Sequence, residues 1–362
     1  MLESNIVTTA PSVIANPRKF IEALGLSERI FLTPSERAFI KVIESGMQQV
    51  EDGLRDELTF GDDLADTAGR YLAEAGGKRL RPALVLLTAQ LGDGNIPSVI
   101  AAAKALEITH LATLYHDDVM DDAPRRRGVQ SAHGVWGNSV AILTGDLLFA
   151  RASTIIARQG NAALRIQAET FERLVLGQLH ETIGPREGED PIAHYIRVLA
   201  DKTGSLIAAA AQMGLVFSNA PEEYEQPLLT YGENIGIAFQ LIDDVIDLAP
   251  ASETGKTPGT DLLAGVATMP SLKLERLAET DAAARDLLTR LQRDVGADAS
   301  GADRADLQRA VEELRNHPVT AETLAEAHQW AAEGTAALDV LPAGHVKKAL
   351  LRFAEAMVER SR

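Results

Sequence analysis

The chain has 362 residues, 46% of them hydrophobic, and its 52 Asp and Glu against 35 Lys and Arg give a formal net charge of -17. A chain this acidic lacks the basic surface that nucleic-acid phosphates require, so we expect no nucleic-acid partner. The absence of cysteine from the sequence excludes disulfide frameworks, thiol catalysis and cysteine-based zinc sites.

Alanine and leucine dominate the chain, aromatic residues are only 4% of it, and alternation of β-branched with polar residues is scarce. This pattern predicts an all-α protein. The first residues show no basic segment followed by an apolar run, and no uninterrupted apolar stretch reaches the roughly 18 residues that a membrane span needs. We therefore expect a cytoplasmic protein without a transmembrane segment, at most peripheral to a membrane.

The predicted elements follow an N-terminal extension, residues 1–32, and fill one domain, residues 33–362. The domain opens with a capping box, in which Thr33 precedes Pro34 and Glu36 stands three residues after Thr33. Helices are predicted over about 34–58, 63–75, 83–91, 97–121, 137–158, 161–183, 191–217, 320–337 and 344–361, with a low-complexity linker at 296–305.

A basic segment follows the glycine pair Gly76-Gly77, which is suited to end a helix because glycine tolerates a positive φ. Lys78, Arg79 and Arg81 place three cations within four residues. These charges repel one another unless an anion is bound. The segment therefore predicts either an anion site at the start of the next helix or a solvated basic turn.

An acidic motif, HDDVMDD at 116–122, ends the helix that follows. Asp117 and Asp121 are four residues apart, so both carboxylates project from one helical face and suit Mg²⁺; the alternative is a solvated acidic helix end. His110 lies on nearly the same face and is either a core histidine or a ligand contact. Arg125–Arg127 come next, as a diphosphate clamp or a surface charge run.

A second copy of the acidic motif, FQLIDDVID at 239–247, closes another apolar run. Asp243 and Asp247 again share one helical face. Two copies in the same context favour a single shared site over chance. The economical chemistry is a cluster of Mg²⁺ ions that bridges both sets of carboxylates to a diphosphate and makes it a leaving group. The carbocation left behind would need an apolar, water-free interior.

Several segments occur in a specific order along the chain. They are Gly76-Gly77-Lys78-Arg79-Leu80-Arg81-Pro82, His110, Asp117-Asp118-x-x-Asp121 with Arg126-Arg127-Gly128, Gly145-Asp146, Gly177-Gln178, Lys202-Thr203 and Phe239-Gln240-x-x-Asp243-Asp244-x-x-Asp247. Together they resemble the trans-isoprenyl diphosphate synthases, the polyprenyl synthetase family, from about residue 42 to the C-terminus. The resemblance implies a single-domain bundle of long helices around a central cavity, the isoprenoid synthase fold, and a homodimer.

The resemblance also implies roles for the matching residues. Three Mg²⁺ ions would be bound by Asp117, Asp121 and Asp243, with Asp118, Asp244 and Asp247 in support. The allylic diphosphate would be held by Arg126, Lys202 and Lys256, with Thr203 and Gln240 near the reacting carbons, and isopentenyl diphosphate by Lys78, Arg81, His110 and Arg127. The catalytic set is then Asp117, Asp121, Asp243, Lys202, Thr203 and Gln240. Ionisation of the allylic diphosphate, attack by isopentenyl diphosphate and proton loss would yield an all-trans polyprenyl diphosphate.

Product length depends in this family on the residues four and five positions before the first acidic motif. Here they are Thr113 and Ala112, small residues that leave the product tunnel open. The motif also lacks a two-residue insertion, which favours the long-chain branch that makes quinone side chains such as that of menaquinone. Leu148 and Phe149 are candidates for the tunnel floor. One departure from the family pattern is Val266, where a second lysine often stands.

Other readings remain open. A geranylgeranyl diphosphate synthase is one alternative, and the catalytic subunit of a heteromeric synthase is another. A class I terpene cyclase would lack the basic isopentenyl site and carry a different second metal motif. A non-catalytic subunit would have lost the acidic motifs, which are complete here. The last two readings therefore fit the sequence less well.

Overall fold

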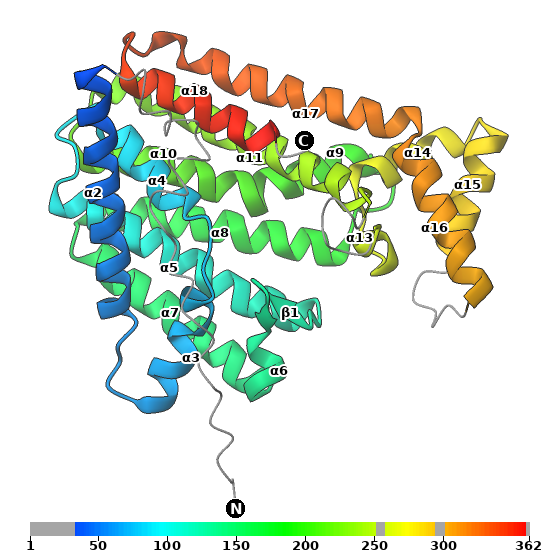
Figure 1. Cartoon of the computed structure of the whole chain (residues 1–362), viewed down its shortest axis with the longest axis horizontal. Coiled ribbons are helices and arrows are strands. Elements are labelled where there is room, and N and C mark those ends of the chain that lie inside the picture. The colour runs from blue at the N-terminus through cyan, green and yellow to red at the C-terminus, as the bar shows by residue number, and fades with distance from the viewer. Residues whose placement is uncertain (1–32, 251–257, 294–300, 360–362) are drawn as a thin grey trace, which may run out of the picture. The chain divides into compact units, whose positions relative to one another are not determined.

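The computed structural model describes residues 33–250, 258–293 and 301–359, with the backbone alone at residue 263 and at 301–305. The described residues are mainly helical and include one ladder of two short strands (Figure 1). The all-α prediction is confirmed. Contacts within the chain define two compact units, each described by itself below. The predicted extension, residues 1–32, lies outside the described residues, and the single domain over 33–362 stays a prediction.

The first unit comprises residues 33–168, 209–225 and 343–349 of the described chain. Its elements are α2 (Pro34–Glu57), α3 (Asp63–Glu74), α4 (Leu80–Ala89), α5 (Pro97–Met120), β1 (Arg125–Arg126), β2 (Val129–Gln130), α6 (Ala132–Trp136), α7 (Asn138–Ala157) and the short 3-10 helix η2 (Glu222–Tyr224), with parts of α8 (Asn161–Ile183), α10 (Ser205–Phe217) and α18 (His345–Val358).

Helix α2 begins at the predicted capping box. The backbone N–H of Thr33 donates to Glu36 Oε2 at 2.9 Å, and the backbone N–H of Glu36 donates to Thr33 Oγ1 at 3.2 Å. Apolar residues then recur every three or four positions, which gives the helix one apolar stripe. This stripe is buried and consists of Ile40, Ile43, Met47, Val50 and Leu54. Through it α2 packs on α4 and α5.

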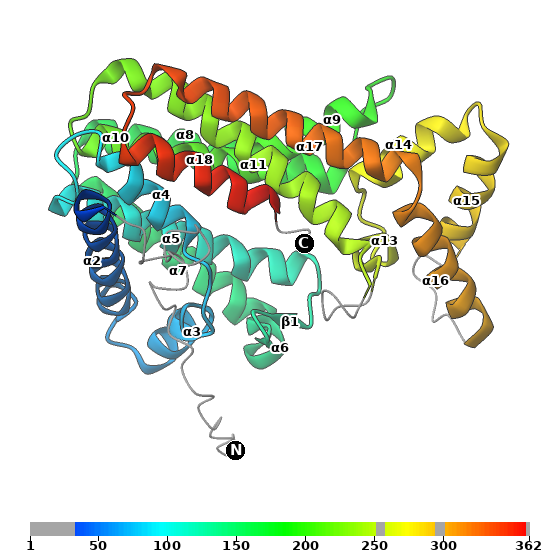
Figure 2. The same cartoon turned by 45° about the horizontal axis from the view of Figure 1, so that its top comes forward.

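Helices α5 and α7 lie side by side in both views of the fold (Figure 1, Figure 2). The fully buried side chains of these two helices include Ile108, Leu111 and Tyr115 of α5 and Leu148 and Ile156 of α7. Each such aliphatic side chain contributes roughly 1.5–3 kcal/mol when fully buried. Gly145 permits a close approach, since a Cβ there would lie 2.3 Å from His116 Nε2. The packing anchors the C-terminal half of α5, which carries the first acidic motif.

Helix α7 is long and apolar enough to span a membrane by length and composition, with a mean hydropathy of 1.6. It is the single helix of this kind among the described residues. It carries Asp146 and Arg151, and 39% of its apolar window is buried inside the protein. Because a core helix of a folded protein meets the same criterion, α7 is only weak evidence for a membrane span.

The second unit comprises residues 169–208, 226–342 and 350–359, with the two gaps given above. Its elements are α9 (Pro191–Leu199), the π-helical turn η1 (Ala200–Gly204), α11 (Glu225–Asp247), α13 (Thr260–Leu263), α14 (Met269–Ala278), α15 (Ala282–Arg293), α16 (Gly301–Arg315), α17 (Pro318–Ala337) and the 3-10 helix η3 (Leu338–Val340), with the remaining parts of α8, α10 and α18.

The helix predicted over 191–217 is interrupted, which corrects that prediction. Residues Ala200–Gly204 form a π-helical turn between α9 and α10. Such a turn accommodates one extra residue and often occurs at functional sites. Gly236 of α11 lies against it, because a Cβ at Gly236 would be 2.5 Å from Gly204 Cα. Gly204 in the turn and Gly236 on α11 therefore allow the two backbones to come into contact. The periodicity of the sequence does not reveal this requirement, because it arises from tertiary packing.

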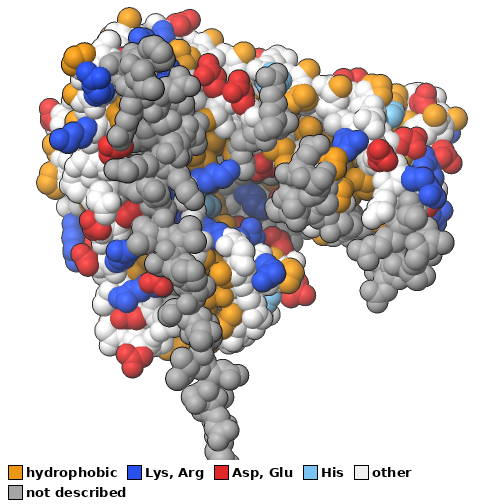
Figure 3. All heavy atoms as spheres, viewed as in Figure 1, with side chains coloured by type: hydrophobic (Ala, Val, Ile, Leu, Met, Phe, Trp, Pro, Cys, Tyr) orange, Lys and Arg blue, Asp and Glu red, His pale blue; other side chains and the backbone are white. Residues whose placement is uncertain are grey.

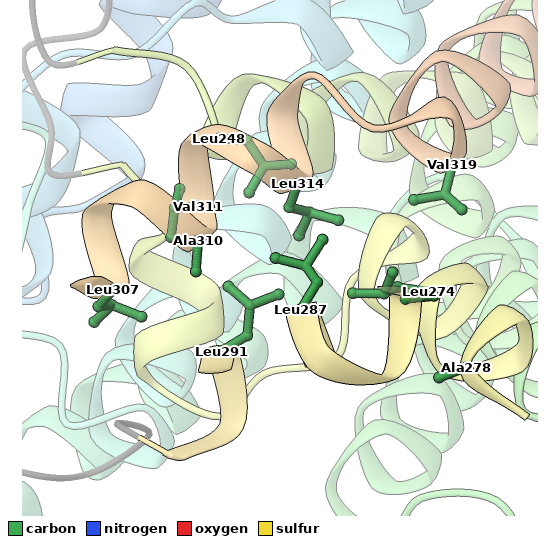
Figure 4. Packing of buried hydrophobic residues seen from close by; sticks show 11 residues of the cluster. Leu248, Leu274, Ala278, Leu287, Leu291, Leu307, Ala310, Val311, Leu314 and Val319 are labelled. Atoms are coloured by element: carbon green, nitrogen blue, oxygen red, sulfur yellow. The ribbon is translucent and has the colours of Figure 1, made fainter. Parts of the chain in front are cut away.

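The linker predicted at 296–305 is wrong for 301–305, because α16 already begins at Gly301; residues 296–300 lie outside the described residues. The helix is stabilised by packing on α15 and its neighbours (Figure 4). The buried cluster consists of Leu248, Leu274, Ala278, Ala284, Leu287, Leu291, Leu307, Ala310, Val311, Leu314 and Val319. Apolar burial thus extends the helix into a stretch whose composition alone indicates a linker.

The outer surface of α15 and α16 is highly charged, with basic and acidic side chains next to each other (Figure 3). Arg290 pairs with Glu313 at 2.5 Å, and Arg293 pairs with Asp306 at 2.7 Å. Exposed pairs of this kind contribute about 0.2–1 kcal/mol each. The apolar cluster beneath them is therefore the larger source of stability.

Candidate functional site

The first acidic motif occupies the last turn of α5, in the first unit. The backbone N–H of Asp121 donates to the Asp117 carbonyl at 2.8 Å, so the helical geometry continues to Asp121. The two carboxylates therefore share one face, as predicted. Asp117 is half-buried and Asp121 is exposed. The chain leaves the helix at Asp122, which has a positive φ of 46°.

Asp118, unlike Asp117 and Asp121, is fully buried. Its side chain has no exposed area, and its Oδ1 accepts a hydrogen bond from Arg126 Nε at 2.6 Å. Its Oδ2 is buried and has no hydrogen-bond partner among the described residues. Burial raises the pKa of Asp118, and the Arg126 guanidinium opposes that rise. Within the motif, the middle carboxylate is thus ion-paired while the outer two keep the accessibility that a metal ion needs.

A tight hairpin follows the motif and sends its arginines to different places. Strands β1 and β2 pair antiparallel, and the turn residues Arg127 and Gly128 have φ values of 53° and 81°, as a two-residue hairpin turn requires. Arg126 reaches Asp118, whereas Arg127 Nη1 donates to the Leu72 carbonyl at 2.7 Å and also to the Gly76 carbonyl. Arg127 therefore lies at the glycine turn that precedes the basic segment.

The three cations of the basic segment have different environments. Lys78 is exposed, Arg81 is half-buried, and Arg79 is buried with only 5% of its surface exposed. Arg79 forms ion pairs with Glu107 at 2.8 Å and with Glu51 at 2.6 Å. The interpretation that all three cations require a bound anion is therefore wrong for Arg79, because the protein supplies its counter-charges from α2 and α5.

His110 lies among these cations. Burial, together with Arg81, Arg127 and Arg79, holds the pKa of His110 well below 6.5, so its imidazole is neutral at neutral pH. Burial also lowers the pKa of Arg81 to about 10, and its Nε has no hydrogen-bond partner among the described residues. A buried donor without a partner is costly. The arrangement can hold an anion, since Arg81 still has donors to satisfy and His110 can offer a neutral N–H.

The second acidic motif occupies the last turns of α11, in the second unit. Asp243 and Asp247 are half-buried, and Asp244 is buried. Asp244 Oδ2 accepts hydrogen bonds from the Tyr195 hydroxyl at 2.8 Å and from the Met269 N–H at 2.9 Å. Burial raises the pKa of Asp244 to about 8, although the two hydrogen bonds act in the opposite direction and lower it. The motif repeats the arrangement of the first, with its middle carboxylate bound by the protein.

The predicted residues Lys202 and Thr203 lie in the π-helical turn and are half-buried. Lys202 Nζ pairs with Glu181 Oε2 of α8 at 2.5 Å. A Cβ at Gly177, one turn earlier on α8, would lie 2.5 Å from the backbone nitrogen of Lys202. Glycine is therefore required where α8 approaches the π-helical turn. Sequence reasoning missed Glu181; its position just after the noted pair Gly177-Gln178 was the available signal. Gln240, also predicted, is half-buried on α11.

Asp261 lies next to the second motif. The backbone N–H of Asp261 donates to Asp247 Oδ2 at 3.1 Å, and Gly259 N–H donates to the Asp247 carbonyl at 2.7 Å. Asp261 also raises the pKa of Asp244. Asp261 was not predicted, although an acidic residue close behind a glycine in that loop was a signal. The predicted Lys256 lies outside the described residues, and Val266 is 44% exposed.

The donor set suits a divalent cation. Hard carboxylate oxygens at i and i+4 repel each other without a counter-charge, and Asp118 Oδ2 is buried without a partner among the described residues. Within those residues no three Asp, Glu or His side chains form a preformed metal cluster. The outer carboxylates of the two motifs belong to different units. The assignment of both motifs to one metal site therefore stays a prediction.

Comparison with known proteins identifies relatives over most of the chain. A model of the polyprenyl synthetase family matches residues 62–312. The nonaprenyl diphosphate synthase of Mycobacterium tuberculosis is 40% identical over 327 residues, which cover 90% of this chain and 95% of that protein. The octaprenyl diphosphate synthase of Escherichia coli is 32% identical over 87% of this chain and 96% of its own.

Solved structures agree with these relatives in fold. A decaprenyl diphosphate synthase from Rhodobacter capsulatus has a TM-score of 0.79 and 31% identity, over 90% of this chain and 99% of that one. A geranylgeranyl pyrophosphate synthase from Corynebacterium glutamicum, complexed with calcium and isoprenyl diphosphate, has a TM-score of 0.76 and 39% identity, over 91% and 98%. The similarity therefore spans nearly the full length of each relative.

The neutral state of His110 predicts a pH dependence of stability. Its folded pKa lies below 6.5, so below that pH the unfolded chain binds a proton that the folded chain does not, and stability falls as pH falls. We expect the wild type to lose more stability than His110→Gln between about pH 6.5 and pH 5.5. Chemical denaturation of the wild type and of His110→Gln at both pH values checks it; equal losses in the two proteins would contradict it.

Proposed function

Because the chain belongs to the polyprenyl synthetase family, we propose that it makes a long-chain all-trans polyprenyl diphosphate for a quinone side chain such as that of menaquinone. It is a prenyltransferase that condenses isopentenyl diphosphate with an allylic diphosphate. The observation that carries the chain-length proposal is the 40% identity to a nonaprenyl diphosphate synthase across 95% of that protein. Small residues at Ala112 and Thr113, both buried on α5, support it.

The metal side of the proposed site consists of the two acidic motifs. Asp117, Asp121 and Asp243 would hold three Mg²⁺ ions, and Asp118, Asp244 and Asp247 would support these carboxylates. Bound Mg²⁺ would neutralise the charge that develops on the allylic diphosphate as its C–O bond breaks. The hydrogen bonds to Asp118 and Asp244 support this division, because they hold the middle carboxylate of each motif and orient the helix end around it.

The isopentenyl diphosphate side consists of Lys78, Arg81, His110 and Arg127. Guanidinium groups bind phosphate oxygens in pairs, and an exposed lysine adds a mobile point charge. The unpartnered Nε of Arg81 and the neutral imidazole of His110 support this assignment, since a diphosphate would provide their acceptors. Anchored by its diphosphate, the substrate would direct its double bond at the ionised allylic carbon, and a proton would then leave to the departing diphosphate.

The allylic diphosphate would be held by Arg126, Lys202 and Lys256, of which Lys256 lies outside the described residues. Arg126 and Lys202 are paired with Asp118 and Glu181. These carboxylates hold the cations in place until a diphosphate, a stronger acceptor, competes for them. Thr203 and Gln240 would lie near the reacting carbons. The exposed Val266 supplies no cation where the family often has lysine.

Two other family activities have specific support. Geranylgeranyl diphosphate synthesis is supported by the 39% identity to the Corynebacterium glutamicum enzyme. A catalytic subunit that needs a partner is supported by 36% identity to component 2 of the heptaprenyl diphosphate synthase of Geobacillus stearothermophilus. Both readings keep the same site and chemistry, and they differ from the proposal only in the product or in the need for a second chain.

Product length tests the proposed function directly. The purified protein with Mg²⁺, farnesyl diphosphate and labelled isopentenyl diphosphate should give a ladder of alcohols, after removal of the diphosphate, that extends well past geranylgeraniol on reversed phase. An end at geranylgeraniol would replace the long-chain product by the shorter one. An absence of elongation that is restored by a second subunit would establish the heteromeric reading.

Removal of an outer carboxylate should stop the reaction while the fold remains. Asp117→Ala and Asp243→Ala should each lower turnover by about a thousandfold or more, because the diphosphate loses the metal ions that neutralise it. Circular dichroism should stay helical, since the two acids repel their neighbours without metal. Asp122→Ala is the matched control, because the Asp122 side chain is 99% exposed beside the same motif. Turnover near the wild-type rate in either test variant would refute the metal site.

Apolar side chains exposed on α8 support the proposed homodimer. Phe171, Val175, Leu179 and Ile183 recur every four residues, with Leu176 beside them, and all five are exposed. An exposed apolar stripe of this kind on one helix marks an interaction surface. We also propose a cytoplasmic location, with peripheral membrane contact for release of the apolar product.

Sedimentation should show a particle of about twice the 38.8 kDa chain mass. Leu179→Glu should shift it towards the monomer, because a charge would be buried at the interface. Val340→Glu is the matched control, since Val340 is 59% exposed on η3. A monomeric wild type, or a Leu179→Glu variant that stays dimeric, would count against this interface.

A further inference from the structure

The backbone of Arg79 directs its side chain into the protein. Its φ of 51° and ψ of 35° lie in the left-handed region at the residue that precedes α4, a conformation that residues other than glycine seldom adopt. Its side chain is 3% exposed, whereas the neighbouring Lys78 is exposed. An unfavourable backbone conformation persists only where surrounding contacts hold it. The contacts of Arg79 therefore identify what its conformation serves.

The guanidinium of Arg79 joins three segments: α2, α5 and the stretch from the end of α3 to the glycine turn. Nε donates to Glu51 Oε1 of α2 at 2.6 Å, and Nη1 donates to Glu107 Oε1 of α5 at 2.8 Å. Nη2 donates to the Ala73 carbonyl at the end of α3 at 3.0 Å, and Nη1 lies 3.5 Å from the Gly76 carbonyl. Helices α2 and α5 are thus connected to the glycine turn that precedes the basic segment.

Arg127 reaches the same turn from the hairpin. It donates to the carbonyls of Leu72 and Gly76, and its guanidinium is 3.9 Å from Glu107. A Cβ at Gly77 would lie 2.9 Å from the Arg127 guanidinium and 3.0 Å from Arg79 Nη1. The two guanidinium groups therefore flank the glycine turn closely, and both use Glu107 as a counter-charge.

The cluster contains more cations than carboxylates. Glu51 and Glu107 supply two carboxylates, while Arg79, Arg81 and Arg127 supply three cations. Arg79 contacts both carboxylates directly, so the protein neutralises it most completely. Arg81, two residues along, keeps a buried Nε without a partner among the described residues. The cluster thus contains one cation that the protein neutralises, Arg79, and another, Arg81, that keeps a donor for an anion.

We propose that Arg79 is a positioning residue for isopentenyl diphosphate, which holds the segment from Gly76 to Arg81 so that Arg81 and Lys78 are presented to the diphosphate. The proposal rests on the function proposed above. Arg79 itself does not touch substrate; it acts through the ion pairs to Glu51 and Glu107. Loss of these pairs releases the glycine turn, and the first residues of α4 lose their fixed position.

The test separates binding of the two substrates. Arg79→Met should raise the KM for isopentenyl diphosphate by about tenfold, which corresponds to about 1.4 kcal/mol of lost interaction, and leave the KM for farnesyl diphosphate near the wild-type value. Titration calorimetry with isopentenyl diphosphate alone should show the same rise in Kd. Arg79→Lys keeps the charge without the planar fork and should fall between wild type and Arg79→Met.

Lys104→Met is the matched control. Lys104 of α5 pairs with Glu57 of α2 at 3.0 Å and is 17% exposed, so it joins the same two helices away from the glycine turn. It should lower the midpoint of thermal unfolding and leave both KM values near wild type. Glu51→Gln removes one charge and keeps an acceptor, so it provides a folded variant if Arg79→Met does not fold; it should raise the KM for isopentenyl diphosphate by about threefold.

The outcomes distinguish this proposal from the function on which it rests. A wild-type protein that elongates no allylic diphosphate, alone or with a second subunit, would refute the proposed function itself. An active wild type, with Arg79→Met and Glu51→Gln that leave the Kd for isopentenyl diphosphate unchanged, would overturn the role of Arg79 alone. Equal rises in both KM values, matched by Lys104→Met, would also overturn it, because they would reflect general loss of structure.

Discussion

Burial of the Glu107 carboxylate in the middle of α5 is the constraint on which the cluster of Arg79, Arg81 and Arg127 depends. A carboxylate with 2% of its side chain exposed requires cationic partners. Arg79 and Arg127 supply them, one from the turn before α4 and one from the hairpin after α5. Segments distant in sequence are thereby brought to a single point. The excess of cations over carboxylates at that point supports the proposal that an anion binds there.

The two acidic motifs place their aspartates in the same way. In each, the first and last aspartates lie on one helical face, and the middle one is rotated by about 100° and enters the protein. Asp118 is met by Arg126, and Asp244 by Tyr195 and a backbone N–H. The buried carboxylate holds its helix end in place, while the outer carboxylates are less buried, as the proposed metal site requires. This division explains why three acids, rather than two, recur in each motif.

Local sequence signals predicted those features that depend on neighbouring residues alone. The capping box at Thr33, the end of α5 at the acidic motif and the positive φ at Gly76 and Gly77 are confirmed. The predicted linker failed where helix α16 gains its stability from a cluster of distant apolar residues. The π-helical turn was missed because it depends on the close approach of Gly236. Glu181 was missed because its partner Lys202 lies 21 residues away.

The sequence by itself determined the chemistry of this protein: the spacing of its carboxylates, the cations near them and the resemblance that their order carries. Spacing along a helix dictates which side chains share a face, so these features can be read without a fold. Only the tertiary structure decided how each charge is used. Arg79 and Arg81 stand two residues apart in one basic segment, yet one meets two carboxylates and the other keeps an unpartnered donor among the described residues. Counter-charges come from distant segments, and only folding brings them together.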